Sequence, residues 1–357
     1  MKRTKYIAIV CNLLFIVGCD ATIHEYPENQ EALVVLEPNV SRMQPEYHKL
    51  ISYDEKGQCT VGMMEETTAQ TYQPEDGYVL RIIADVYEGR IDEQSGERHR
   101  VSRRVVITDK DAQPPQDTIH IRLPEGNYYV LAWADYVREN EEADWHYMTD
   151  TLTKIKTNLD TYPDNTHHRS SATGSQVFDI DYNLTQEGYP TVKSEVLTSR
   201  TVPVNISRPS GRYRVVALDY EDFVRTGGKP EEITVKVIYK QYVSVGYNVA
   251  TGEPNRFVST YSFNVRPSDT RYEGKKEASL FGDYLFTGSN GETNVLADFY
   301  FFDALGHEIS HSQNIEIPLK RDHETVIAGY FLTHSLGHGD DVSIDDKFDG
   351  EFVVEID

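Results

Sequence analysis

Cysteine is scarce in this sequence: 357 residues contain three, at positions 11, 19 and 59. The first two lie in the N-terminal apolar segment or at its end, so Cys59 is the one cysteine in the rest of the chain. A disulfide within the folded part is therefore not expected, and apolar burial has to supply the stability. We expect Cys59 to be a buried, inert thiol.

Long apolar runs are also rare. Residues 6–17 form the longest, which is too short for the roughly 20 residues that span a bilayer. Basic residues precede this run, and Ile16-Val17-Gly18-Cys19 follows the pattern of a lipobox. We therefore predict a lipoprotein signal peptide at 1–18, a lipid on Cys19 and a polar lipidated tether over 19–31. An ordinary cleaved signal followed by a chance cysteine is the alternative.

Positive charge is in deficit, with 35 Lys and Arg against 58 Asp and Glu and a net charge of −23. A surface this acidic repels phosphate backbones, so a nucleic-acid partner is not expected. Asp20 and the acidic residues after Cys19 favour sorting to the cell outer membrane. We expect the lipid to hold the protein there, with its folded part exposed on the surface.

Helical spacing is scarce, and residues 148–159 are the best candidate for a helix. Apolar residues instead alternate with a period of two, which is typical of strands with one buried face. The clearest such faces are Leu80/Ile82/Ala84/Val86, Ile119/Ile121/Leu123 and Ile233/Val235/Val237/Tyr239, and 33–36 is the first predicted strand. The predicted fold class is all-β, with short strands arranged in sandwiches.

One segment is repeated. Residues 119–132 read IHIRLPEGNYYVLA and residues 204–217 read VNISRPSGRYRVVA, with six identities at an offset of 85 residues. Each copy predicts a strand, a Pro-x-Gly turn and a second strand. Chance convergence on a common hairpin is the alternative to a duplicated domain. We place two β-sandwich domains at 32–200 and 201–357.

His307-Glu308-Ile309-Ser310-His311 matches the zinc-protease signature H-E-x-x-H. That chemistry needs a helix, whereas the surrounding residues favour strands joined by a turn. On a strand the Cα atoms of His307 and His311 would be roughly 13 Å apart, too far for one tetrahedral ion. We interpret the motif as a chance match on a hairpin, and a zinc hydrolase as the most distant alternative.

Other chemical motifs are weaker still. The acidic residues at 340–346 lack calcium-loop spacing and are interpreted as a solvated turn. His167-His168 is a weak metal candidate without partner ligands. We find no nucleophile elbow, phosphate loop or Cys/His cluster. The expectation is a protein that is not an enzyme, with no cofactor and no metal.

Aromatic residues offer a second functional class. Trp133, Trp145 and the 24 tyrosines could form a platform on which a sugar ring stacks, although such residues more often fill the core of a β protein. A glycan-binding surface lipoprotein is therefore the alternative function.

Several stretches resemble the fimbrial-anchor lipoproteins of Bacteroidota, the family of the minor-fimbrium anchoring subunit and its relatives. They are Gly18-Cys19-Asp20, IHEYP at 23–27, LPEGNY at 123–128, WADYV at 133–137, PSGRY at 209–213, Asp222-Phe223, PLKRDHET at 318–325 and DGEF at 349–352. These stretches cover both halves of the chain in order.

The resemblance implies two transthyretin-like, Greek-key β-sandwiches in tandem and attachment to the outer membrane through Cys19. It implies cell adhesion through a fimbrium, with a fimbrial subunit as partner and β-strand pairing as the means of assembly. Polymerising members of such families lose their first strand by trimming after a basic residue. Here no Lys or Arg lies between Cys19 and Arg42, and an anchor should remain uncut.

The C-terminal strand is the candidate for pairing with that partner. Phe352, Val354 and Ile356 alternate with polar or smaller residues, which would give an added strand a defined register. Only one connection constrains a terminal strand, so it is easily displaced or lent. The alternative is that this strand simply completes the second sandwich.

Overall fold

The computed structural model describes residues 31–39, 46–62, 77–89, 99–107, 118–139, 144–162, 167–180, 200–267, 276–336 and 352–355. Within these ranges strands dominate, and the helical elements are the short α2 (Tyr220–Arg225) and three 3-10 turns. None of these helical elements has the length and apolarity needed to cross a membrane. The predicted all-β class with sandwich domains is confirmed.

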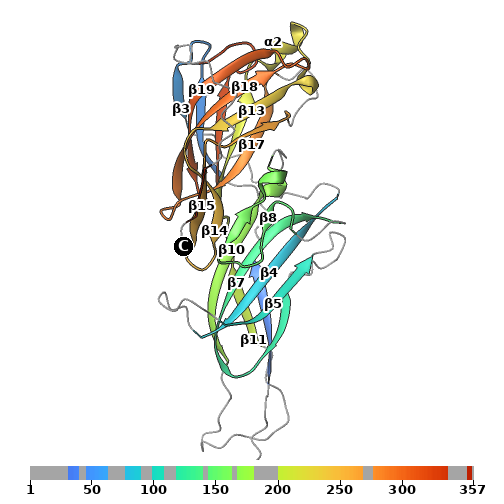
Figure 1. The fold of residues 1–357 in the computed structure, drawn as a ribbon, viewed down its shortest axis with the longest axis vertical. Helices are drawn as coiled ribbons and strands as arrows, with labels where there is room; N and C mark the ends of the chain where they lie inside the picture. Colours follow the sequence, from blue (N-terminus) through green and yellow to red (C-terminus); the bar gives the residue numbers. More distant parts are fainter. Residues whose placement is uncertain are drawn as a thin grey trace, which may run out of the picture.

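Two sandwiches lie one above the other along an elongated molecule (Figure 1). The first packs a three-stranded sheet, in the order β11-β1-β6, against a four-stranded sheet, β10-β7-β4-β5. Its strands are β1 (Ala32–Asn39), β4 (Tyr78–Glu88), β5 (Arg100–Ile107), β6 (Ile119–Leu123), β7 (Gly126–Arg138), β10 (Ser171–Ile180) and β11 (Arg200–Asn205).

Alternating side chains from both sheets fill the core of the first sandwich. Val34 and Leu36 of β1 are fully buried there, together with Ile82 and Val130. The expected apolar faces of β4 and β6 both point into this core. β4 is also buried on its other face, where Ile83 and Tyr87 join a second apolar cluster.

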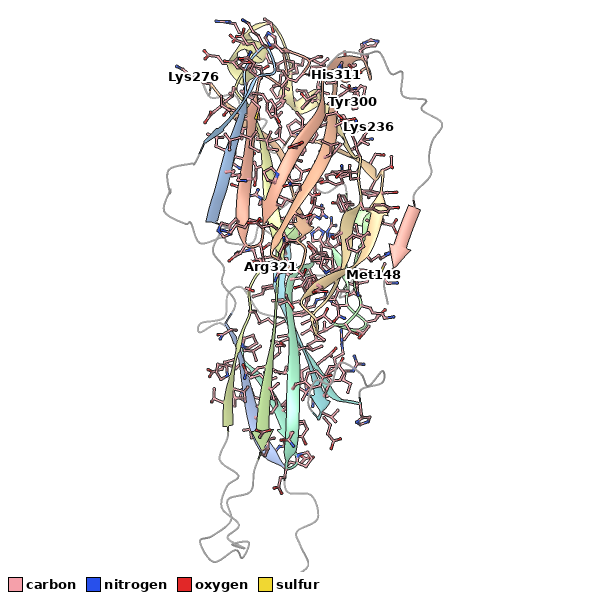
Figure 2. All side chains as sticks on the ribbon, turned by 90° about the vertical axis from the view of Figure 1, so that its left-hand side faces the viewer. Met148, Lys236, Lys276, Tyr300, His311 and Arg321 are labelled. Carbon is pink, nitrogen blue, oxygen red and sulfur yellow. The ribbon has the colours of Figure 1, made fainter. Side chains whose placement is uncertain are left out.

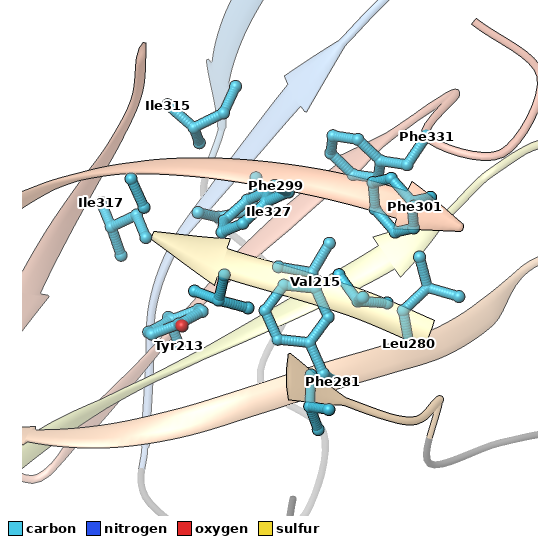
Figure 3. Packing of buried hydrophobic residues seen from close by; sticks show 14 of the residues in the cluster. Tyr213, Val215, Leu280, Phe281, Phe299, Phe301, Ile315, Ile317, Ile327 and Phe331 are labelled. Carbon is cyan, nitrogen blue, oxygen red and sulfur yellow. The ribbon is translucent and has the colours of Figure 1, made fainter. Parts of the chain in front are cut away.

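The second sandwich packs the sheet β17-β12-β20-β2-β3 against the sheet β16-β13-β18-β19. The first of these sheets contains β2 (Glu46–Tyr53), β3 (Cys59–Gly62), β12 (Ser210–Ala217), β17 (Ala278–Phe286) and β20 (His323–Gly329). The other contains β13 (Thr234–Tyr239), β16 (Ser262–Val265), β18 (Glu292–Phe302) and β19 (Glu308–Lys320). Phe281, Phe299 and Ile327 stand in the core between the two sheets (Figure 3).

A fifth sheet lies between the sandwiches and takes strands from both halves of the chain, in the order β21-β15-β14-β9-β8. It consists of β8 (Tyr147–Met148), β9 (Ile155–Thr157), β14 (Val243–Asn248), β15 (Glu253–Ser259) and β21 (Phe352–Glu355). We call this part of the molecule the junction. Trp133, Tyr147, Tyr247 and Phe286 pack together there, so apolar burial couples the sandwiches.

Strand pairing crosses the predicted domain boundary at residue 200. β2 and β3 come early in the chain, yet β2 pairs in parallel with β20 of the second sandwich. β11 begins at Arg200 and extends past the boundary, but it pairs with β1 of the first sandwich. The division at 200/201 remains a prediction for the domains, and it does not describe which strands share a sheet.

The repeated segment forms two crossings between sheets rather than two hairpins. In the first copy β6 and β7 belong to opposite sheets of one sandwich, and in the second copy β11 and β12 belong to different sandwiches. Gly211 is required for close packing, since a Cβ atom there would lie 2.8 Å from the carbonyl oxygen of Lys320. The expected order of strand, turn and strand holds in both copies.

The expected helix at 148–159 is wrong. The segment holds the end of β8, all of β9 and the start of the 3-10 turn η1 (Leu159–Thr161). Leu152, Ile155 and Thr157 are buried at the junction. Tertiary burial and pairing with β14 therefore override the weak helical spacing.

Candidate functional site

The candidate pairing strand β21 occupies an edge of the junction sheet. Its four residues pair antiparallel with β15, with Phe352 opposite Ser259 and Glu355 opposite Arg256. Among the strands that the structure describes, β15 is the one neighbour of β21 in the sheet. β21 therefore completes neither sheet of the second sandwich. Ile356 lies outside the described residues, as does Cys19.

A second exposed edge belongs to β3, the outermost strand of the five-stranded sheet in the second sandwich. All four of its residues are exposed, Val61 to 66%. Cys59 is exposed as well, so its predicted burial is wrong. The described part of this edge carries neither proline nor charge, the devices that usually discourage pairing with another chain.

The edge strand β5 of the first sandwich is better protected. Arg103 reaches the buried carboxylate of Asp85 at 2.9 Å, and Arg100 approaches it at 3.4 Å. Burial raises the pKa of Asp85, while the two guanidinium groups act in the opposite direction. A row of arginines held in this way disfavours the approach of another strand to β5.

The zinc-protease motif lies at the β18–β19 hairpin, as predicted. His307 precedes β19 and is exposed, with its Nδ1 3.3 Å from Asp303 Oδ2. His311 is on β19, with its Nδ1 2.7 Å from Glu308 Oε1. The two histidines therefore have separate carboxylate partners. Within the described ranges, no three His, Cys, Asp or Glu side chains are grouped as metal ligands.

The two tryptophans proposed for a sugar platform are not exposed side by side. Trp133 is fully buried at the junction, where its ring meets the edge of Tyr147 at 5.2 Å between centroids. Trp145 is partly exposed, but the guanidinium of Arg138 lies 3.9 Å from its ring centroid. A sugar would have to displace this cation to stack on that face.

A buried stack of aromatic rings holds the two histidines nearest the junction. Tyr78 stacks on His168 at 3.7 Å between centroids and lies parallel to His146 at 6.1 Å. Both nitrogens of His146 are buried, and neither has a hydrogen-bond partner in the described structure. The weak metal candidate at 167–168 thus places its second histidine in a packed stack.

Burial lowers the pKa of both stacked histidines. The pKa of His146 falls to about 2, first through desolvation and then through the positive charges of Arg169, His168 and Arg138. The pKa of His168 falls to about 4 through desolvation. Both rings are therefore neutral at physiological pH, and the fold opposes their protonation.

The carboxylate of Asp283, on β17, contacts residues from both halves of the chain near the junction. Its carboxylate accepts hydrogen bonds from the hydroxyls of Tyr162 and Tyr239, each at 2.5 Å, and contacts the Arg169 guanidinium at 2.5 Å. The Tyr239 hydroxyl is in turn 2.8 Å from that of Tyr213. Burial, followed by the nearby carboxylate, holds the pKa of Tyr162 well above its ordinary value, so this hydroxyl remains a donor.

A second buried ion pair anchors the junction segment to the first sandwich. Arg81 of β4 donates two hydrogen bonds to Asp135 of β7, at 2.6 and 2.8 Å, and a third to Asp144 at 2.7 Å. Asp144 in turn accepts from the backbone and hydroxyl of Thr149, just after β8. Charge-assisted hydrogen bonds and packed aromatic rings therefore join the sandwiches at the junction.

Sequence reasoning missed this joint. Asp283 and Arg81 occur as single charges among apolar residues, Arg169 lies in a polar stretch, and none of the three matches a motif. A charged residue within an otherwise apolar strand was the one signal of a buried partner. The acidic residues at 340–346 lie outside the described structure, so their interpretation as a solvated turn stays a prediction.

Solved structures of similar fold come from Bacteroidota. A candidate adhesin of Bacteroides ovatus matches with a TM-score of 0.41 and 13% identity, over 85% of this chain and 88% of that one. A candidate polysaccharide-binding protein of Bacteroides thetaiotaomicron matches at 0.39 and 11%, over 80% of each chain. The fimbrial anchor protein Mfa2 of Porphyromonas gingivalis matches at 0.37 and 13%, over 80% of this chain and 82% of its own.

No curated protein matches the sequence. One family model does, and it extends from residue 52 to residue 357, which takes in most of both sandwiches. The chain belongs to the family of unknown function DUF6562.

Proposed function

We propose that the protein is a structural lipoprotein of the cell outer membrane that anchors or nucleates a fimbria-like assembly. Its lipid-bearing end would be Cys19, and its partner would be a fimbrial subunit that joins by β-strand pairing. Assembly by strand pairing would need no catalytic residue, cofactor or metal. The observation that carries it is the placement of β21, which lies at the edge of a sheet and, among the described strands, pairs with β15 alone.

Strand pairing suits β21 for two physical reasons. Backbone hydrogen bonds supply affinity for any extended segment, and the two-residue periodicity of side chains selects the register. The ladder to β15 is short, at four residue pairs, so replacing or extending it disturbs little else. The β15 edge and the free side of β21 are therefore the two places where a partner strand could add.

The sequence supports the proposed lipid attachment at Cys19. The lipobox-like Ile16-Val17-Gly18-Cys19 after a short apolar run is typical of lipoproteins that are anchored after export. Two or more acyl chains are needed for stable anchoring, since a single chain binds only marginally. Anchoring would leave the tether of residues 19–31 between the lipid and β1.

The glycan alternative gains no support from the aromatic residues that suggested it. Trp133 is buried and the Arg138 guanidinium lies over Trp145. The hydrolase alternative is equally weak, since His307 and His311 belong to a turn and a strand with separate partners. Neither function is proposed.

A proline scan of β21 tests the pairing. On an antiparallel edge strand, consecutive N–H groups point alternately toward the neighbouring strand and away from it. Val353→Pro and Val354→Pro therefore each remove one donor, one from the ladder to β15 and the other from the free side. Partner chains that copurify with the lipoprotein from native membranes would be quantified by mass spectrometry for both variants.

Loss of partner with only the outward-donor variant would identify β21 as the platform on which the partner strand adds. Loss with only the other variant would identify the ladder to β15 as the required element. Deletion of residues 350–357 provides the third arm. If both proline variants and the deletion retain the partner while the protein stays folded, pairing at this edge is refuted.

A further inference from the structure

We infer that the chain is a force-transmitting link, in which parallel strand pairs resist a pull on the N-terminal end by shear along their full length. The inference rests on the proposed function, since an anchored subunit is stretched between its lipid and its partner. What carries it is the direction in which the strands leave the first sandwich.

β1 is the strand through which such a pull would enter. It lies between β11 and β6, and its pairing with β11 is parallel over six residue pairs, from Val34/Arg200 to Asn39/Asn205. The chain continues from the C-terminal ends of both strands into the second sandwich, from β1 to β2 and from β11 to β12. A pull on residue 31 against the second sandwich reaches it directly along the chain into β2. It also reaches it through the β1–β11 ladder, where it acts on the two strands in opposite directions along their common axis.

Such a pull loads the ladder in shear. The hydrogen bonds of a parallel pair are evenly spaced along the strands, so all of them share the load and none can open first. The buried face of β1 adds resistance, because Val34 and Leu36 are fully enclosed. A slip by one residue would turn this apolar face away from the core.

The second sandwich repeats the arrangement. β2 and β12 enter it from the first sandwich and flank β20, and both pair with it in parallel. The registers run from Glu46/His323 and from Arg212/Glu324 toward the far end of the sheet. Figure 2 places Arg321, just before β20, near the middle of the molecule and Lys276 near its far end. Tension along the long axis therefore shears both ladders together.

Buried ion pairs join these strands where the tension enters the sheet. Arg212 of β12 contacts Glu324 of β20 at 2.5 Å, and Arg214 approaches the same carboxylate at 3.3 Å. Arg208, just before β12, contacts Asp322, just before β20, at 2.6 Å. Sliding would separate the buried Arg212–Glu324 pair, which is costly because each charge is left without its partner out of water.

The pairing of β21 with β15 can be compared with the pairing of β1 with β11 in the same protein. The ladder of β21 to β15 has four residue pairs at a sheet edge, so a pull on the chain beyond Glu355 has fewer pairs to break than a pull on β1. The same protein thus carries a six-pair parallel ladder near one end and a four-pair edge ladder near the other. The two can be compared without any substitution in the strands themselves.

Single-molecule pulling tests the inference. The chain from residue 20 onward, carrying Cys59→Ser, would be held through Lys276→Cys and through either its N-terminus or its C-terminus. We expect the first rupture at severalfold higher force in the N-terminal geometry. Equal first-rupture forces in the two geometries would overturn the inference.

A variant pair tests the ionic contribution. Arg212→Met should shorten the lifetime under constant N-terminal pull on the order of tenfold, because forced unfolding follows the unfolding rate. Arg225→Met is the matched control, since Arg225 pairs with Asp222 on the exposed helix α2, outside the parallel ladders. An unchanged lifetime for Arg212→Met, in protein shown by denaturation to be folded, would remove the ion pairs from the mechanism.

The measurement needs neither lipid nor partner, so the two proposals fail separately. Weak resistance in the N-terminal geometry would overturn force transmission and leave anchoring through Cys19 intact. Absence of lipid on Cys19 would overturn anchoring and leave the rupture force unchanged.

Discussion

Replacing His146 by phenylalanine should remove a defined part of the acid sensitivity of this protein. The imidazole is buried with both nitrogens unpaired, and its pKa is lowered to about 2. The unfolded chain binds a proton at this side chain near pH 6.5. Between these two pH values only the unfolded state is protonated, so stability falls as the pH falls.

The magnitude follows from linkage. One proton taken up only by the unfolded chain costs about 1.4 kcal/mol of stability per pH unit. From pH 6.5 to pH 4.5 His146 alone should therefore remove about 2 kcal/mol, because at pH 6.5 only half of the unfolded chains carry the proton. His168, with a pKa of about 4, adds to the same loss over the same interval.

Phenylalanine keeps an aromatic ring against Tyr78 and Trp145 and cannot titrate. The His146→Phe variant should match or exceed the wild type in stability at pH 7.5, because no hydrogen bond is lost with the imidazole nitrogens. Its stability should then decline about 1.4 kcal/mol less per pH unit below pH 6. Urea unfolding followed by tryptophan fluorescence at pH 7.5, 6.5, 5.5 and 4.5 measures both quantities.

His120→Phe is the matched control, since His120 is exposed on β6 and the substitution should leave the pH dependence unchanged. The reasoning is refuted if His146→Phe follows the pH dependence of the wild type. That result would mean that the folded protein accepts the proton without cost.

Three further outcomes are expected. Cys19→Ser should abolish incorporation of radiolabelled palmitate and release the protein from membranes or leave its signal attached, and equal labelling of the variant would contradict a lipid at this position. Replacing His307 and His311 by Ala should change the stability by no more than about 0.5 kcal/mol per site and leave the metal content unchanged, as checked by denaturation and elemental analysis. Arg169→Met should lower the free energy of unfolding by about 3–5 kcal/mol, because it leaves the Asp283 carboxylate buried without its cation; urea titration measures this, and a loss below about 1 kcal/mol would contradict a structural role for the pair.

Local pattern predicted the strands well. Residues with one buried face, such as Ile119 and Ile121 on β6 or Val235 and Val237 on β13, carry the two-residue period in the sequence itself. The all-β class and the strand that follows each Pro-x-Gly turn came from the same signal. The hairpin around His307 was predictable because turn residues separate two β-favouring runs.

The sequence could not show which strands share a sheet. β2 reads as an ordinary strand, and nothing within it indicates pairing with β20. The exposure of Cys59 depends on that same pairing, because β3 is added outside β2. Burial of both faces of β4 depends on the junction, which assembles from segments distant in sequence. The sequence thus predicted that the residues of β21 form a strand, but it did not predict that this strand pairs with β15.

The chain enters the second sandwich already at β2, and this affects the order in which the sheets can form. β2 emerges directly after β1, yet its partner β20 begins only at His323, near the end of the chain. β1 likewise pairs with a strand that is synthesised much later, β11, which begins at Arg200. Closing such large loops costs entropy before any contact compensates for it, so chains of this topology fold slowly. The first sandwich can be completed once β11 has been synthesised, whereas the sheet that receives β2 cannot be completed until β20 has been made. The second sandwich should therefore form last, and β2 and β3 need protection from other chains until β20 has been synthesised.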